Sequence, residues 1–75
     1  MTIKEMNVPF DDGISKIIQE KGFKQVYVAK QAGFTSQGLS DMLNGRKLIK
    51  ACDIVLIAKV LGVKMDDIYE AGKGE

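Results

Sequence analysis

Apolar residues recur along most of the chain at the three- and four-residue spacing of amphipathic helices. The first stripe runs from Phe10 to Ile18 and predicts a helix. Asp11 or Asp12 can cap its start, and Gly22 can end it. No stretch alternates between apolar and polar residues as a half-buried strand does, so the sequence predicts an all-α fold.

Further short helices follow by the same rule. They are expected over about residues 24–32, 36–43, 50–61 and 65–69. Gly33 can end the second helix, Thr35 is a good N-cap for the third, and Gly62 can end the fourth. The fold expected is therefore a compact bundle of about five short helices.

The pattern fades at both ends of the chain. Residues 1–9 are expected to be an N-terminal arm, a dimer contact or a disordered segment, and residues 71–75 a flexible tail. Residues 10–70 form the expected domain. The 75 residues suffice for one core, and a core this small relies on close helix packing or on a partner subunit.

The composition removes several classes of site. The single cysteine, Cys52, has no partner for an internal disulfide, and the chain has no histidine, so the usual zinc ligand sets are missing and no cofactor is expected. Cys52 itself is expected to be a small buried or half-buried residue. The start of the chain lacks the apolar run of a signal peptide, and the stretch from Ile54 to Ala58 is too short to cross a bilayer. A soluble cytoplasmic protein without a membrane partner is expected.

Charge is distributed unevenly along the chain. The net charge is only +1, but residues 1–20 carry −2, residues 21–50 carry +5 and residues 51–75 carry −2. A nearly neutral protein with a basic centre can still present one face that attracts phosphate.

The basic centre also holds the most informative pattern. Residues 24–43 are expected to be a helix, a three-residue turn with glycine and a second helix, the unit that places its second helix in the DNA major groove. Ala29 is small enough for the two helices to cross closely, and Gly33 can take a positive φ in the turn. The expected seam between the helices consists of Val28, Ala32, Phe34, Leu39, Met42 and Leu43.

This run resembles the Cro/phage-repressor type of helix-turn-helix, often called the Xre family. The resemblance covers residues 25–62 and includes Gln25, Ala29, Gly33, apolar residues at 39 and 42, Asn44-Gly45 and Leu61-Gly62. It implies a fold like the λ-repressor DNA-binding domain, with the helix-turn-helix as helices 2 and 3. Members often have Pro and then Ser or Thr before the fourth helix. Here Ile49 and Lys50 stand there, so Asp53 is expected to support the helix start by its charge.

The expected third helix and its flanks supply the candidate DNA contacts. Ser36, Gln37, Gly38 and Asp41 are the expected base-contacting residues. Gln37 is the best candidate because its amide can pair with adenine N6 and N7. Asp41 could instead repel phosphate, pair with Arg46 or simply be exposed, and Gly38 could allow a close approach either of DNA or of another part of the protein. The expected phosphate-contacting residues are Lys24, Gln25, Asn44, Arg46 and Lys47, with Lys50 as a further contributor.

A domain of this kind is expected to bind double-stranded DNA as a homodimer on a two-fold symmetric operator and to act as a repressor. The expected dimer contacts are Val63, Met65, Ile68 and Tyr69, or the arm with Val8 and Phe10. The alternative is a helical protein-interaction module, such as an antitoxin-like protein, with weak or no DNA binding. An enzyme is the least expected class, because the sequence has no histidine and no phosphate-binding glycine loop.

Overall fold

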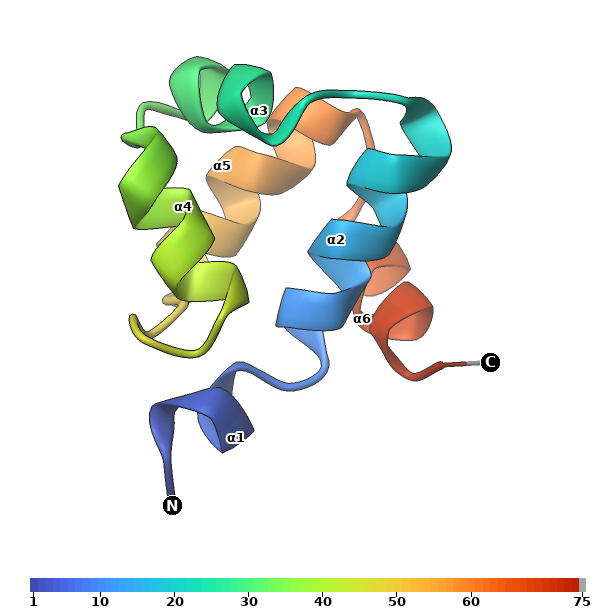
Figure 1. Ribbon diagram of the computed structural model, residues 1–75. Coiled ribbons are helices and arrows are strands. Elements are labelled where there is room, and N and C mark those ends of the chain that lie inside the picture. The colour runs from blue at the N-terminus through green and yellow to red at the C-terminus, as the bar shows by residue number, and fades with distance from the viewer. Residues whose placement is uncertain (75) are drawn as a thin grey trace.

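The computed structural model describes residues 1–74, which form a bundle of six helices (Figure 1). The helices are α1 (Ile3–Asn7), α2 (Phe10–Lys21), α3 (Gln25–Ala32), α4 (Ser36–Leu43), α5 (Ala51–Leu61) and α6 (Met65–Gly72). No strand occurs within residues 1–74, so the all-α prediction is confirmed. The five expected helices are present, and α1 is an additional one.

The helix ends agree with most of the expected caps. Gly22, Gly33 and Gly62 each follow a helix in the left-handed conformation. Thr35 caps α4, with its Oγ1 accepting a hydrogen bond from the Gly38 N–H at 2.9 Å. The expected cap of α2 was wrong, because Pro9 is the N-cap and makes no side-chain cap bond.

Aspartates play two different roles at the helix starts. At the start of α5 the Lys50 N–H donates to Asp53 Oδ2 at 3.1 Å, so Asp53 supports this end by a direct bond. Asp11 lies inside the first turn of α2 and is fully buried. Its carboxylate accepts from the Asp12 N–H at 2.8 Å and pairs with Lys4 Nζ at 3.1 Å. Asp11 therefore connects α2 to the N-terminal segment.

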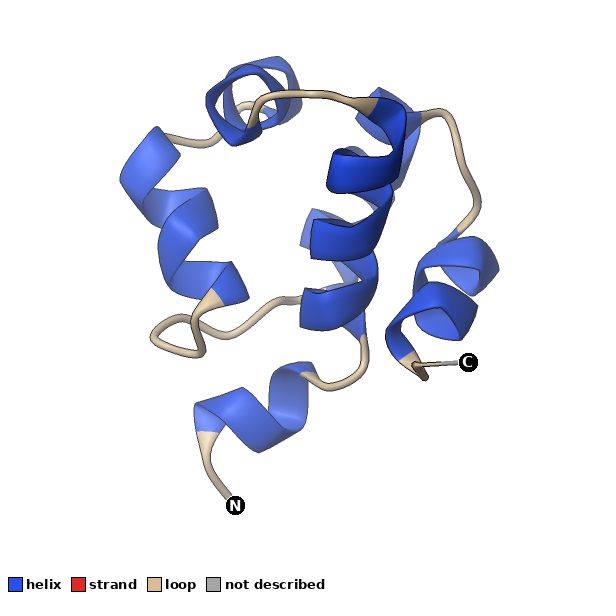
Figure 2. Cartoon of the chain, turned by 45° about the vertical axis from the view of Figure 1, so that its right-hand side comes forward, coloured by secondary structure: helices blue, strands red, loops and turns tan. Residues whose placement is uncertain are grey.

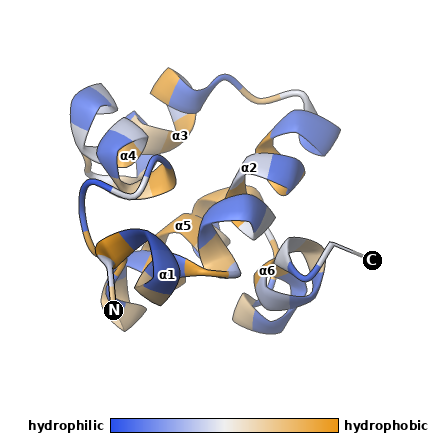
Figure 3. Ribbon diagram, turned by 60° about the horizontal axis from the view of Figure 1, so that its bottom comes forward, coloured by the Kyte–Doolittle hydropathy of each residue, from blue (hydrophilic) through white to orange (hydrophobic). Residues whose placement is uncertain are grey.

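The core lies between α2, α3, α4, α5 and α6. Its fully buried large side chains include Ile14, Val28, Leu39, Met42, Ile57, Leu61 and Ile68. On α5 the side chains that face this core are Ile54, Ile57, Ala58 and Leu61, which are all buried. Seen from the side of α1, α5 is the most continuously hydrophobic helix and lies behind α2 (Figure 3).

Two glycines let α6 pack directly on the N-terminal half of α2. The two helices lie side by side in Figure 1 and in the turned view of Figure 2. A Cβ on Gly13 would lie 1.9 Å from the Ile68 carbonyl oxygen, and one on Gly72 would lie 1.8 Å from the Pro9 carbonyl oxygen. No side chain fits at either position, so the backbones themselves are in contact.

Residues 1–9, which were expected to form an arm, contain the short helix α1. Its start carries a capping box, in which Thr2 Oγ1 accepts from the Glu5 N–H and Glu5 Oε1 accepts from the Thr2 N–H. The Thr2 N–H bond lowers the pKa of the Glu5 carboxyl. Figure 1 places α1 beside the loop that leads from α4 to α5.

The C-terminal segment departs from expectation in one respect. Ala71 and Gly72 belong to α6, so the helix continues into the segment expected as a tail, whereas Glu75 lies outside the described residues. Within residues 1–74, no helix has the length and apolar character needed to cross a membrane.

Candidate nucleic-acid interface

Helices α3 and α4 are held at a fixed angle by a three-residue turn, residues 33–35. Gly33 has φ 89°, and the next N–H, that of Phe34, donates to the Ala29 carbonyl at 2.8 Å. Ala29 is completely buried at the crossing, where a larger side chain would separate the helices. These features give the turn one conformation and fix the direction in which α4 leaves it.

Helix α4 has one buried side and one outward side. Leu39 and Met42 face the core. Ser36 and Gln37 are exposed, and Asp41 is half-buried at its margin. Ser40 is half-buried as well, and its spacing of four residues from Ser36 places it on the outward side. Ser40 was not among the predicted base-contacting residues, although its spacing from Ser36 is visible in the sequence.

A hydrogen-bonded network joins Gln37 and Asp41 on the outward side of α4 to Arg46 in the following loop. Gln37 Nε2 donates to Asp41 Oδ1 at 2.8 Å, and Arg46 Nη1 donates to the same oxygen at 3.2 Å. The bond from Gln37 and then the bond from Arg46 lower the pKa of the Asp41 carboxyl. Of the roles considered for Asp41, pairing with Arg46 is therefore present in the free protein.

The loop from residue 44 to residue 50 is bonded to the end of α4. The N–H groups of Arg46 and Lys47 donate to the Asp41 carbonyl at 2.8 and 3.2 Å. Asn44 Nδ2 donates to the Ser40 carbonyl at 2.8 Å. The Lys47 side chain is exposed, so the loop carries cations beside the outward side of α4.

The start of α3 is a second polar element next to the turn. Lys24 is its N-cap and makes no side-chain cap bond, and Gln25 is its first residue. Both side chains are exposed, and the first turn contains no acidic residue. A helix start without an acid retains the partial positive charge of its free N–H groups.

These features agree with a match to a known family. The family model described as helix-turn-helix matches residues 14–68, which includes α3, the turn and α4. The chain belongs to the Cro/phage-repressor type of helix-turn-helix proteins. Comparison with curated proteins found no significant match. The family is one of DNA-binding regulators, and α4 occupies the place of its recognition helix.

Gly38 lies within the recognition helix of this helix-turn-helix protein. A Cβ at this position would have one neighbour, Thr35 Oγ1 at 3.0 Å, which belongs to the cap of the same helix. No other element packs against Gly38. Of the two explanations considered for this glycine, a close contact with another part of the protein is thus limited to the Thr35 side chain, and a close approach of DNA stays a prediction.

The four expected dimer contacts of the last turn differ in how far their side chains are exposed. Ile68 was wrong as a dimer contact, because its side chain is fully buried in the core and cannot reach a second copy. Val63 and Met65 are half-buried against the same core. Tyr69 is 42% exposed, and its ring packs on Phe10 with 5.7 Å between the ring centroids. Tyr69 thus has the largest exposed fraction of these four residues.

Cys52 also differs from expectation. It lies in the first turn of α5 and is exposed, so the expected buried or half-buried position was wrong. The apolar stripe of α5 begins at Ile54, and Cys52 precedes it by two residues on the outer side.

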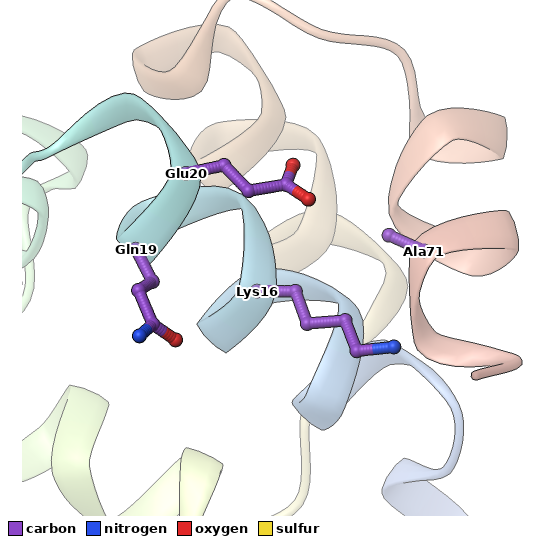
Figure 4. Close-up of a pocket in the computed structure, with 4 residues that line it drawn as sticks. All are labelled: Lys16, Gln19, Glu20 and Ala71. Carbon is purple, nitrogen blue, oxygen red and sulfur yellow. The ribbon is translucent and has the colours of Figure 1, made fainter. Parts of the chain in front are cut away.

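A shallow hollow opens between α2 and α6, away from the recognition helix (Figure 4). Lys16, Gln19, Glu20 and Ala71 line it. The first three side chains are exposed, and in Figure 4 Lys16 and Glu20 extend toward the side of Ala71 whereas Gln19 extends away. The hollow thus brings together no buried polar groups. Within residues 1–74, no group of three potential metal ligands comes together.

Proposed function

We propose that this helix-turn-helix protein is a sequence-specific regulator that acts as a repressor, binding as a dimer to a two-fold symmetric DNA site. The observation that carries the proposal is the position of one polar network. Gln37 and Asp41 lie on the outward side of α4, and Arg46 joins them from the next loop. A helix with such a side fits the major groove, where base edges differ in their donors and acceptors.

Base recognition is assigned to Ser36, Gln37 and Asp41, with Gly38 allowing the helix to approach closely. The Gln37 amide can pair with adenine N6 and N7, and Ser36 can bond several base edges. In the free protein the bond to Asp41 restrains the Gln37 amide. This restraint lowers the entropy that Gln37 loses when it binds a base.

Phosphate recognition is assigned to two groups on either side of α4. The first is the start of α3 with Lys24 and Gln25, whose free N–H groups suit an anion. The second is the loop with Asn44, Arg46 and Lys47, to which Lys50 adds a further charge. Phosphate contacts of this kind fix the register of α4 without reading sequence.

A dimer would cover two half-sites about one helical turn apart and block access of polymerase to the promoter. Tyr69 is the leading residue for the contact between copies, with Val63 and Met65 beside it. Val8, which is 53% exposed, and the neighbouring Phe10 offer the second surface. Two copies double the DNA contacts of one small domain, which by itself buries a modest interface.

The first experiment is fluorescence anisotropy with a pool of random-sequence duplexes at several salt concentrations, followed by selection of the bound sequences. We expect micromolar or tighter binding that weakens steeply with salt, and an enriched site with two-fold symmetry. Gln37→Ala should reduce discrimination between the enriched site and the random pool. Arg46→Ala should weaken binding to both and lower the salt slope by about 1.

The exposed Gln31→Ala substitution in α3, which removes no assigned contact, is the matched control and should leave both quantities unchanged. No binding at low salt would overturn the proposal and favour a protein-interaction module. That alternative draws on exposed apolar side chains such as Val26 and Tyr27 on α3, which are 61% and 49% exposed.

A further inference from the structure

Asn7 is a buried polar residue whose side chain forms hydrogen bonds with the end of α4 and with the loop between α4 and α5. It ends α1 and is 1% exposed. Its Nδ2 donates to the carbonyls of Met42 at 3.1 Å and Lys47 at 2.9 Å, and its Oδ1 accepts from the Ile49 N–H at 2.8 Å. All three partners are backbone groups at the end of α4 or in the loop after it, 35 to 42 residues away.

These bonds act on a loop that has little support from its own residues. The carbonyl of Asp41 holds the N–H groups of Arg46 and Lys47 from one side. Asn7 holds the following stretch, at Lys47 and Ile49, from the other side. Arg46 and Lys47 are thus bonded to α4 through the Asp41 carbonyl, and the Lys47 carbonyl and the Ile49 N–H are bonded to Asn7, which lies outside the helix-turn-helix.

The rest of α1 supports the same contact. The backbone of Lys4 passes so close to Gly45 that a Cβ on this glycine would lie 2.8 Å from Lys4 Cδ and 3.2 Å from Lys4 Cα. The Lys4 ammonium group pairs with the buried carboxylate of Asp11 at 3.1 Å, which fixes α1 on α2. Helix α1 is therefore attached to α2 through Lys4 and to the loop through both Lys4 and Asn7.

We infer that Asn7 is a positioning residue for DNA binding, which holds Arg46 and Lys47 where they contact the phosphate backbone. This inference rests on the proposed function. A loop that is already ordered loses less conformational entropy when its side chains bind phosphate. The N-terminal segment thus increases DNA affinity through the loop, without an assigned contact of its own to the duplex.

The test compares Asn7→Ala with the unaltered protein on the fluorescent pool of random-sequence duplexes, over a series of salt concentrations. We expect Asn7→Ala to raise Kd by about tenfold and to lower the slope of log K against log salt by about 1. Ile68→Val serves as the control for lost stability, because Ile68 is fully buried in α6 and has no bond to the loop. It should leave the salt slope unchanged, with both variants measured well below their unfolding temperatures.

A second comparison separates positioning from a general effect on the fold. In an Arg46→Ala, Lys47→Ala background, Asn7→Ala should have little further effect on Kd, because the side chains it positions are gone. If Asn7→Ala does not fold, Asn7→Ser replaces it. Ser is neutral and keeps a polar group, but its shorter side chain cannot bond to the Lys47 carbonyl and the Ile49 N–H at once.

The outcomes are distinct. An unchanged Kd and slope for a folded Asn7 variant, or an effect fully additive with Arg46→Ala, Lys47→Ala, would overturn the inference while leaving DNA binding intact. Failure of the unaltered protein to bind any duplex would overturn the proposed function, and this inference with it.

Discussion

The side-chain oxygen of Asn7 accepts a hydrogen bond at 2.8 Å from the backbone N–H of Ile49, 42 residues further along the chain. Ile49 is itself buried, and no backbone carbonyl of residues 1–74 accepts from its N–H. Asn7 therefore provides the partner of a donor that would otherwise be buried and unpaired, a costly arrangement inside a protein.

Asn7→Ala should consequently destabilise the fold. It leaves the Ile49 N–H without its acceptor and the Lys47 carbonyl without its donor. We expect a loss of about 2 kcal/mol in the free energy of unfolding, measured by urea denaturation. The exposed Gln19→Ala substitution in α2 is the control and should stay within about 0.5 kcal/mol of the unaltered protein. Equal stability of the two variants would show that the Asn7 bonds contribute nothing net.

Gly13→Ala should destabilise the contact between α2 and α6 strongly. A Cβ at this position would lie 1.9 Å from the Ile68 carbonyl oxygen, so α6 would have to move away from α2. We expect a loss of about 3 kcal/mol or more in thermal or urea unfolding, since the obstructing atom belongs to the backbone. Ser15→Ala, two residues away in the same helix and exposed, is the matched control. A Gly13→Ala protein as stable as this control would contradict the close packing of the two helices.

Gly38→Ala tests whether the recognition helix approaches DNA closely at this position. The substitution gains about 1 kcal/mol in helix propensity and crowds only Thr35 Oγ1, so the net change in stability should stay within about 1 kcal/mol. DNA binding should nevertheless weaken if α4 approaches DNA here as proposed, because the added methyl group would occupy part of the space between the helix and the bases. Anisotropy and urea unfolding on the same preparation measure both effects. Unchanged affinity would remove Gly38 from the interface.

The pKa of Asp41 reports the network on α4. We expect an NMR titration to place it below the ordinary aspartate value of 3.8, because the ionised carboxylate accepts bonds from Gln37 and Arg46. A lowered folded-state pKa means that the network adds stability above pH 3.8 and that this stability is lost as the pH falls through the folded-state value. Gln37→Ala and Arg46→Ala should each raise this pKa, because each removes a hydrogen bond to the ionised carboxylate, and an unchanged pKa in both variants would contradict the network.

The sequence predicted α3, the turn and α4, but it did not predict the structure of the N-terminal segment. The signal for α1 was nevertheless present, since Thr2 and Glu5 have the spacing of a capping box. Nothing local could indicate the partner of Asn7, because its contacts depend on how α1 folds back over the loop. The same limit explains Ile68, for which apolar character alone could not distinguish the protein core from a dimer contact.

The sequence by itself determined where most helices begin and end and which two form the DNA-binding unit. Helix periodicity, the Thr35 cap and the Gly33 turn depend on residues within a few positions of one another, so they can be recognised along the chain. Only the tertiary structure decided that Asn7 holds the loop of Arg46 and Lys47, that α2 and α6 touch through Gly13, and that Ile68 is unavailable to a partner. These relationships join residues far apart in sequence, and they exist only once the packing of the core has fixed the helices relative to one another.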